Sequence, residues 1–265
     1  MMGEVERPMS DSQRPKREAT QVHTRILRCM LAVDDCYAYW RRVDNTAPAN
    51  RAAIAFEQRW FGTKSEARVR TLITEMAARF DPYPEALALL SSIGPLAPGL
   101  LPWLCHTHLQ LADPIYRRFT GELLPARRAQ GYTTIDRVGV AEWVDQLYPE
   151  RWSHATAMKF AANMIATGLE VGILQGRRDP RTLTIGHVPG EAIGYAMYLL
   201  RGVEIDGPLV GSPYLRSLGL NADAMVSISL RVPGVRCAKI GDIVDITWEE
   251  ATLDAWGRRY LRGPS

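Results

Sequence analysis

Four consecutive pieces of the sequence decide the fold: YTTID at 132–136, VGVAEWVDQL at 138–147, SHATAMKFAANMIATGLEVG at 153–172 and GRRDPRTLTI at 176–185. The first piece is rich in β-branched residues and predicts a short strand from Tyr132 to Ile135. The second and third pieces carry apolar residues at helical spacing, and Pro149 separates them. In the fourth piece a turn at 176–180 leads into the alternating strand 182–185. The predicted order is therefore strand, helix, helix and hairpin.

The helix after Ser153 has the clearest pattern in the chain. Ser153 is a favourable N-cap and Gly172 allows a left-handed exit, so the helix should span the residues between them. One face carries apolar side chains at steps of three and four and is predicted to lie in the core: Ala155, Met158, Ala162, Ile165 and Leu169. The opposite face carries hydrogen-bonding side chains and no acid: His154, Thr156, Lys159, Asn163 and Thr167. A polar face of this composition suits base edges and phosphates.

Three arginines mark the hairpin that follows. Arg177 and Arg178 lie in the predicted turn, and Arg181 precedes the return strand. A helix followed by an arginine-tipped hairpin is how winged-helix domains hold duplex DNA, with arginines on phosphates and the second helix in the major groove. The predicted DNA-binding residues are Ser153, His154, Thr156, Lys159, Asn163, Arg177, Arg178 and Arg181. Two plainer interpretations stay open: a solvated amphipathic helix, and a winged helix that binds protein.

The length and composition indicate a globular, mainly α-helical protein with more than one folding unit. The chain has 265 residues, of which 46% are hydrophobic and 23% are charged, and its formal net charge is +3. A charge this small permits nucleic-acid binding without arguing for it, so the location of the arginines matters more. We expect a disordered segment 1–19, a helical bundle 20–130, a winged-helix-like domain 131–201 and a small mixed C-terminal extension 202–265 that packs on the preceding domain.

Helical spacing and capping signals locate the elements outside the central stretch. In the bundle they predict helices over 19–43, 49–61, 66–80, 84–93, 101–111 and 114–124, with Thr63 and Glu66 as a capping box for the third. After the hairpin they predict a helix over 190–201, strands over 224–232 and 240–246, and a closing helix capped by Thr247. Cys29 and Cys36 are seven residues apart in the first helix and should share one buried face.

Several classes of function find no support in the sequence. Motifs for phosphate-binding loops, nucleophile elbows, zinc proteases and EF-hands are missing, so we expect no enzyme activity and no cofactor. Cys105, His106 and His108 lie close together without a second ligand cluster, so we expect no metal site. The start of the chain has no hydrophobic leader, which predicts a cytoplasmic protein. Residues 86–112 are uncharged, but glycines and prolines interrupt them, which predicts two buried helices instead of a membrane span.

The layout also resembles that of the BrxA family, whose members are encoded in bacteriophage-exclusion (BREX) defence loci. The likeness rests on the helix at Phe56–Trp60 with the capped helix 66–80, on the helix pair 101–124, and on the segments 152–156 and 168–174. It covers roughly residues 20–200, and this chain departs from the family in its tail after Arg201. The resemblance implies a mostly helical protein of two globular domains that binds double-stranded DNA.

Together these observations predict a non-enzymatic accessory protein of a BREX-type antiviral defence system that binds double-stranded DNA and serves in phage resistance. Its partners would be duplex DNA and other BREX subunits, and not a membrane. Two alternatives stay open: a protein-interaction scaffold within a defence complex, and a winged-helix transcriptional regulator. A DNA-binding protein should lose affinity as salt rises, whereas an apolar scaffold interface should hardly respond.

Overall fold

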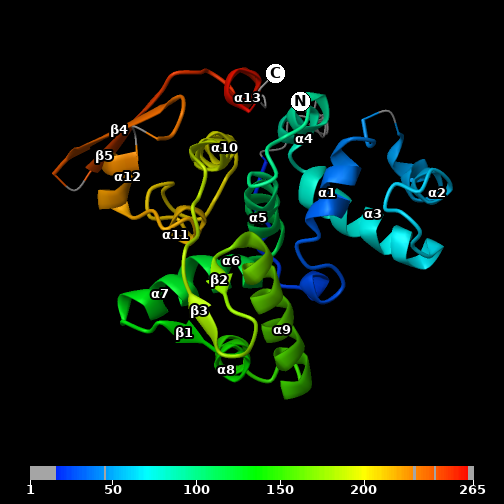
Figure 1. The fold of residues 1–265 in the computed structure, drawn as a ribbon, viewed down its shortest axis with the longest axis horizontal. Coiled ribbons are helices and arrows are strands. Elements are labelled where there is room, and N and C mark those ends of the chain that lie inside the picture. The colour runs from blue at the N-terminus through cyan, green and yellow to red at the C-terminus, as the bar shows by residue number, and fades with distance from the viewer. Residues whose placement is uncertain (1–15, 45, 229–230, 242, 262–265) are drawn as a thin grey trace, which may run out of the picture.

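The protein is mainly helical, as its sequence predicts. A computed structural model describes residues 16–44, 46–228, 231–241 and 243–261. In Figure 1 one helix, α5 (Leu101–Ala112), stands at the centre, and the other elements are arranged around it. The disorder predicted for residues 1–15 lies outside the described residues. Residues 16–19 are ordered, contrary to the prediction, because Arg17 forms a β-bridge with Glu204 and Glu18 is buried.

Five helices form the first part of the chain. Their bounds are α1 Val33–Trp40, α2 Arg51–Glu57, α3 Glu66–Phe80, α4 Pro84–Ser92 and α5 Leu101–Ala112. α3, α4 and α5 agree with their predicted bounds to within one residue. α2 is shorter at both ends, because a 3-10 turn, Pro48–Asn50, precedes it and Arg59, with a φ of 50°, follows it. The cap of α3 is Ser65, whose hydroxyl accepts from the Arg68 amide, and not the predicted Thr63.

The predicted helix 19–43 is wrong over most of its length. The chain makes a 3-10 turn at Arg25–Leu27, and α1 begins only after Ala32, whose φ of 53° lies in the left-handed region. The physical reason is the Arg79 side chain of α3, which donates to all three backbone carbonyls of residues 29–31. These carbonyls accept from a guanidinium instead of from helical amides, so the helix cannot continue through them.

The uncharged run 86–112 forms two buried helices joined by a loop, as predicted. α4 ends at Ser92 and α5 begins at Leu101. From Trp103 to Ala112 every residue of α5 is buried, so this helix runs through the hydrophobic core. Within the described parts of the chain, no helix combines the length and the hydrophobicity that a membrane crossing requires.

After α5 the chain turns and continues as three short helical pieces. These are α6 Pro114–Arg118, a π-helical turn Phe119–Leu123 and α7 Leu124–Ala129. Asp113 caps α6 by accepting from the Ile115 and Tyr116 amides. The helix predicted over 114–124 therefore begins where expected and ends later. Within the π-helical turn Gly121 has no side chain, which lets the backbone of Pro213 approach closely.

A small sheet and two helices come next, in the predicted order. They are β1 Thr134–Ile135, α8 Arg137–Leu147, α9 His154–Val171, β2 Leu174–Gln175 and β3 Arg181–Leu183. The strands form an antiparallel sheet in the order β1-β3-β2, with Thr134 opposite Thr182 and Leu174 opposite Leu183. α9 packs against α8, against α5 and against the 3-10 turn at Arg25–Leu27. The hairpin β2–β3 therefore closes a sheet that begins with β1.

The last part of the chain is mixed α/β. It forms α10 Gly190–Arg201, α11 Pro213–Ser217, α12 Ala222–Ile228, the hairpin of β4 Val235–Ile240 and β5 Ile243–Trp248, and α13 Leu253–Tyr260. α10 has the predicted bounds and packs against α5 and α13.

Two predictions in this last part are wrong. Residues 224–228, predicted as the first part of a strand over 224–232, belong to the helix α12. The Asn221 side chain accepts from the Ala224 amide and so caps the start of this helix. Ser229 and Leu230 of the predicted strand lie outside the described residues. Thr247 lies in β5, and Thr252 caps α13 instead. A run of six alternating residues is too short to distinguish a strand from two helical turns. Here the capping side chain favours the helix.

Gly194 sets the spacing between α10 and α13. A Cβ atom at this position would overlap the ring of Trp256, which is fully buried and donates its indole N–H to the Pro233 carbonyl. We expect Gly194→Ala to lower the free energy of unfolding by about 1–3 kcal/mol, because the buried ring must shift.

Gly139→Ala in α8 is the matched control, since the nearest heavy atom to its new Cβ is 3.5 Å away. This variant should be neutral or slightly stabilising, because alanine favours the helix. Urea denaturation of both variants checks the prediction. Equal stability of the two would show that α10 and α13 are not packed this closely.

Candidate nucleic-acid interface

The ends of α9 are where the sequence places them. The Ser153 hydroxyl accepts from the Thr156 amide at 3.3 Å and lies 3.1 Å from the Thr156 hydroxyl. At the other end Gly172 has a φ of 95°, which ends the helix at low cost. Ser153 and Thr156, both predicted to contact DNA, are therefore engaged in the cap of α9.

The buried face of α9 is not the predicted one. Ala155 is exposed, Met158, Ala162 and Leu169 are half-buried, and of the predicted stripe only Ile165 is buried. The core instead takes Ala157, Phe160, Ala161, Met164, Thr167, Gly168 and Val171. The reason is Phe160, the largest apolar side chain of the helix, which is fully buried and packs on the ring of Trp152.

This rotation of the helix moves two of the polar residues away from solvent. The Asn163 side-chain amide donates to the Ile26 carbonyl at 2.9 Å, and Thr167 is fully buried. Asn163 therefore lies on the side of α9 that faces the N-terminal segment, and Thr167 lies in the core. The predicted contact of Asn163 with a DNA groove is not compatible with this position.

Asn163→Ala tests the revised position. We expect the variant to lose about 1–3 kcal/mol of stability, because the carbonyl of the buried Ile26 loses its donor, and to bind duplex DNA like the wild type. Thermal melts and DNA titrations check this. Lys159→Ala, exposed on the same helix, should show the reverse pattern. A loss of DNA affinity in Asn163→Ala without loss of stability would restore the original assignment.

The exposed side of α9 carries a mixture of basic and small residues. His154, Ala155 and Lys159 are exposed, and Ala162 and Ala166 are half-buried. The His154 Nδ1 atom lies 2.9 Å from the Asp145 carboxylate. Lys159 has no hydrogen-bond or ion-pair partner among the described residues. Within the part of the chain that the structure describes, this side therefore offers one free cation, Lys159, on a surface of small side chains.

The hairpin tip lies beside that side of α9. A cleft of about 310 Å³ is lined by Ala162 and Ile165 of α9, by Arg137 of α8 and by Asp179 and Arg181 of the hairpin. The Asp179 carboxylate accepts from the Arg137 amide at 3.1 Å, which ties the tip to the start of α8. In Figure 1 the hairpin loop extends to α8 and α9, which pack directly on each other.

The three hairpin arginines have different environments. Arg177 and Arg178 are exposed, and neither has a partner within the described parts of the chain. Arg181 is half-buried and donates to the Gly176 carbonyl at 2.8 Å, so it stabilises the turn. We call His154, Ala155, Lys159, Arg177 and Arg178 the helix–hairpin surface.

Arg128 of α7 holds the base of the hairpin, a role that sequence reasoning missed. Its Nη2 atom donates to the Ile173 carbonyl before β2 and to the Thr184 carbonyl after β3, at 3.4 and 3.3 Å. Burial lowers the pKa of Arg128 without preventing it from being charged. An arginine pair on a helix gives no sequence signal for such a contact, because the carbonyls it reaches are distant in the chain.

The segment 131–201 has no net excess of basic side chains, so its positive charge is confined to part of its surface. Residues 131–201 carry as many acidic as basic side chains. Asp136, Asp145 and Asp179 are engaged with α8 amides or with His154. The positive potential is therefore concentrated at the hairpin tip and Lys159.

A buried Ser–His pair has the geometry of a nucleophile and base but not the environment of one. The His106 Nε2 atom lies 3.0 Å from the Ser217 hydroxyl, and its Nδ1 atom lies 2.8 Å from the Tyr116 hydroxyl. The Ser217 hydroxyl donates to the Tyr214 carbonyl, and both members of the pair are buried. Burial lowers the pKa of His106 to about 3, which makes it a weak base. The pair therefore closes a hydrogen-bond network in the core.

The neighbouring Cys105 and His108 do not join His106 at one point. His108 has one ring nitrogen 3.2 Å from the Arg79 carbonyl and the other 2.7 Å from the Tyr195 hydroxyl. Across residues 16–261, apart from the positions left undescribed, no group of three or more histidine, cysteine or acidic side chains could hold a metal ion.

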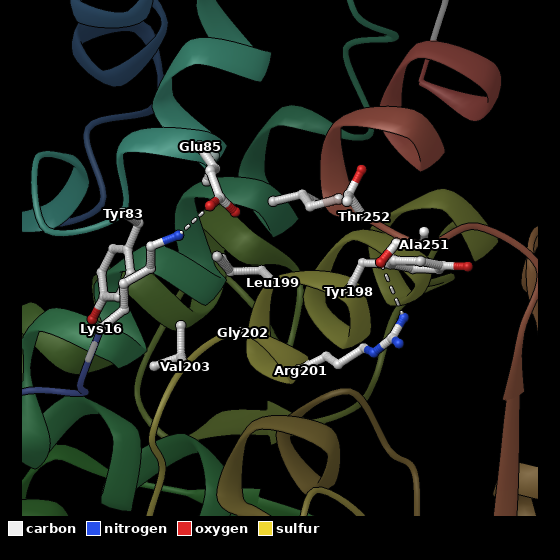
Figure 2. Close-up of a pocket in the computed structure, with 12 residues that line it drawn as sticks. Lys16, Tyr83, Glu85, Tyr198, Leu199, Arg201, Gly202, Val203, Ala251 and Thr252 are labelled. Carbon is white, nitrogen blue, oxygen red and sulfur yellow. Dashed lines mark hydrogen bonds and ion pairs between the residues drawn. The ribbon is translucent and has the colours of Figure 1, made fainter. Parts of the chain in front are cut away.

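A separate cavity of about 200 Å³ lies where α4, α10 and the start of α13 meet (Figure 2). Its charged side chains already have partners: Lys16 lies 2.7 Å from Glu85, and Arg201 donates to the Ala251 carbonyl. Leu199 and Val203 add apolar surface. The cavity holds no nucleophile paired with a base.

No protein-family model, curated protein or solved structure matches this chain. The helix–hairpin surface is therefore the feature of the chain that points to a function.

Proposed function

We propose that the protein is a non-enzymatic duplex-DNA-binding protein that uses the helix–hairpin surface, with β1, α8, α9, β2 and β3 acting as a winged helix. The observation that carries the proposal is a pair of arginines, Arg177 and Arg178, at a hairpin tip beside the exposed side of α9, neither of which has a partner among the described residues. Winged-helix proteins place the second helix and the hairpin against one duplex. Unpartnered guanidinium groups at that tip are suited to phosphate oxygens.

The proposed contact is mainly to the DNA backbone. The exposed side of α9 carries alanines where a base-reading helix carries amides or arginines, and Asn163 is engaged with Ile26. Alanines allow close approach to the duplex but give little discrimination between bases. Binding should therefore tolerate many sequences, which favours an accessory DNA-binding protein over a regulator confined to one operator.

The biological setting that we propose follows from the family resemblance in residues 20–200. A sequence-tolerant duplex-binding protein is a reasonable accessory of a BREX-type defence system, which must engage phage DNA of varied sequence. Other subunits of such a system would be its protein partners.

A protein-interaction scaffold is the second candidate, and one observation favours it. The exposed and half-buried residues Ala155, Met158, Ala162, Ala166 and Leu169 give α9 an outward side that is mostly apolar. Small and flexible apolar side chains are well suited to packing against a helix of another protein. In that case Lys159 would be a rim charge.

Fluorescence anisotropy separates the two candidates. Random-sequence duplex DNA, the corresponding single strand and an RNA of the same sequence are titrated at about 50 and about 200 mM salt. We expect the tightest binding to the duplex, with a loss of about fortyfold over this salt range if Lys159, Arg177 and Arg178 each contact one phosphate. Absence of duplex binding at the lower salt concentration would favour the scaffold.

A further inference from the structure

Arg128 reaches both arms of the hairpin from α7, a helix that is not part of the hairpin. Its Nη2 atom donates to the Ile173 carbonyl, just before β2, at 3.4 Å and to the Thr184 carbonyl, just after β3, at 3.3 Å. Figure 1 shows α7 beside this sheet. One nitrogen of α7 therefore joins the two arms at the base of the hairpin.

Stability alone does not explain why an arginine occupies this position. The Arg128 side chain is half-buried, and its Nε atom is buried without a hydrogen-bond partner in the described structure. No acidic side chain of the described residues forms an ion pair with it. Burying a guanidinium costs free energy, and two hydrogen bonds of this length, shared by one nitrogen, offset little of that cost. The contact therefore serves the position of the hairpin more than the stability of the fold.

The hairpin has few hydrogen bonds of its own to fix its direction. β2 and β3 are paired over two residue pairs. Gly172 and Gly176, both with a positive φ, precede and follow β2. A two-stranded hairpin is marginally stable by itself, and glycine allows the backbone to turn at either position. Contacts from outside the hairpin must therefore set its direction relative to α9.

Outside contacts restrain the hairpin at its edge, its tip and its base. β1 pairs with β3 along the edge, and the Arg137 amide donates to the Asp179 carboxylate at the tip. Arg128 provides the contact at the base, and among these three contacts it is the one that joins both arms. α7 packs on α11 and on the π-helical turn Phe119–Leu123, so Arg128 extends from a well-packed support.

We propose that Arg128 is a positioning residue for DNA binding, which holds the base of the hairpin so that Arg177 and Arg178 stay beside the exposed side of α9. The proposal rests on the proposed function, because it treats these two arginines as phosphate contacts. Arg128 acts through them and adds no phosphate contact of its own.

The expected effect depends on the fraction of molecules whose hairpin is in place. The apparent affinity for DNA falls in proportion to that fraction. Arg128→Met removes every donor but keeps an apolar side chain of similar length, so the variant should fold. We expect it to bind duplex DNA about fivefold to tenfold more weakly than the wild type, which corresponds to a hairpin in place in roughly 10–20% of molecules.

A double-mutant cycle on the full-length protein tests the proposal. Affinity for random-sequence duplex DNA at about 50 mM salt is measured for the wild type, for Arg128→Met, for the Arg177→Ala, Arg178→Ala double variant and for all three changes combined. We expect the triple variant to bind like the double variant, because a hairpin without its arginines has no phosphate contacts to position. A purely structural role would not give this dependence when every variant is assayed well below its melting temperature.

Arg127→Met is the matched control. Arg127 is the neighbouring arginine of α7 and is also half-buried, but its guanidinium lies over the Tyr132 ring, 4.6 Å from the ring centroid. The control variant loses the same charge from the same helix and should keep the wild-type affinity for DNA.

Hydrogen exchange measures the hold on the hairpin without DNA. In Arg128→Met the amides of residues 174–183 should exchange about tenfold faster than in the wild type, whereas those of α9 should not change. Hairpin amides that exchange at the wild-type rate would overturn the proposal. A triple variant weaker than the double variant by the full factor that separates Arg128→Met from the wild type would also overturn it. Duplex binding that is unchanged in the double variant would instead refute the proposed function, and the role of Arg128 in DNA binding with it.

Discussion

Acidification from about pH 6.5 towards pH 4 is expected to destabilise the protein by up to about 2.7 kcal/mol per pH unit. The cause is the pair of core histidines of α5, His106 and His108, which are both fully buried. Burial lowers the pKa of each to about 3. In the unfolded chain the same groups titrate near their ordinary pKa of about 6.5.

The direction follows from proton binding. Between these two pKa values the unfolded chain binds protons that the native protein excludes, so stability falls as pH falls. The contribution is fully present above about pH 6.5 and is lost progressively towards pH 3. Burial raises the pKa of Asp113, so this group makes the native protein more stable as pH falls. The two histidines have the larger combined effect because two groups oppose one.

Urea denaturation at a series of pH values from 7 to about 4 measures the effect. His106→Gln and His108→Gln should each lower stability at pH 7 and reduce the pH slope by about half, since one titrating group remains. A stability that does not change between pH 7 and pH 5 would mean that the two histidines are accessible to protons.

Replacing Arg177 and Arg178 together by alanine is expected to weaken duplex binding by about tenfold to a hundredfold, if each exposed phosphate contact contributes about 0.7–1.4 kcal/mol, within the usual net range of a hydrogen bond in water. The loss should be similar for every sequence, because phosphates carry no base identity. Neither side chain has a partner within the described residues, so thermal stability should be unchanged.

Arg258 and Arg259 of α13 provide the matched control. They are also adjacent arginines on the surface, and Figure 1 places α13 at the far end of the molecule from the hairpin. Their double replacement by alanine changes the net charge equally and should hardly alter DNA affinity at moderate salt. Equal losses in the two double variants would mean that total charge, and not the hairpin tip, drives binding.

Local signals allowed the ends of many elements to be predicted. Ser153 and Gly172 fixed α9, and Pro84 fixed the start of α4, because caps and prolines act on the backbone of their own neighbours. The order of β1, α8, α9 and the hairpin also followed from the pattern, since each step is a change of period or a turn. These parts needed no knowledge of distant residues.

Contacts from distant residues explain what the sequence pattern missed. The rotation of α9 depends on Phe160 meeting Trp152, and the break in the helix predicted over 19–43 depends on Arg79, which is far along the chain. The predicted role of Asn163 was wrong for the same reason. Its side chain donates to the carbonyl of Ile26, which is distant in the sequence, so the helix pattern alone could not reveal the contact. Of the predicted site residues, Lys159, Arg177 and Arg178 are exposed and unpartnered among the described residues, as a DNA contact requires.

The salt dependence of duplex affinity, measured on the wild type and on the Arg177→Ala, Arg178→Ala double variant, tests the central claim most directly. With three phosphate contacts the slope of log affinity against log salt should be about −2.7 in the wild type and about −0.9 in the double variant. The control with both α13 arginines replaced should keep the wild-type slope. A double variant whose slope equals that of the wild type would contradict the claim that the hairpin tip holds DNA.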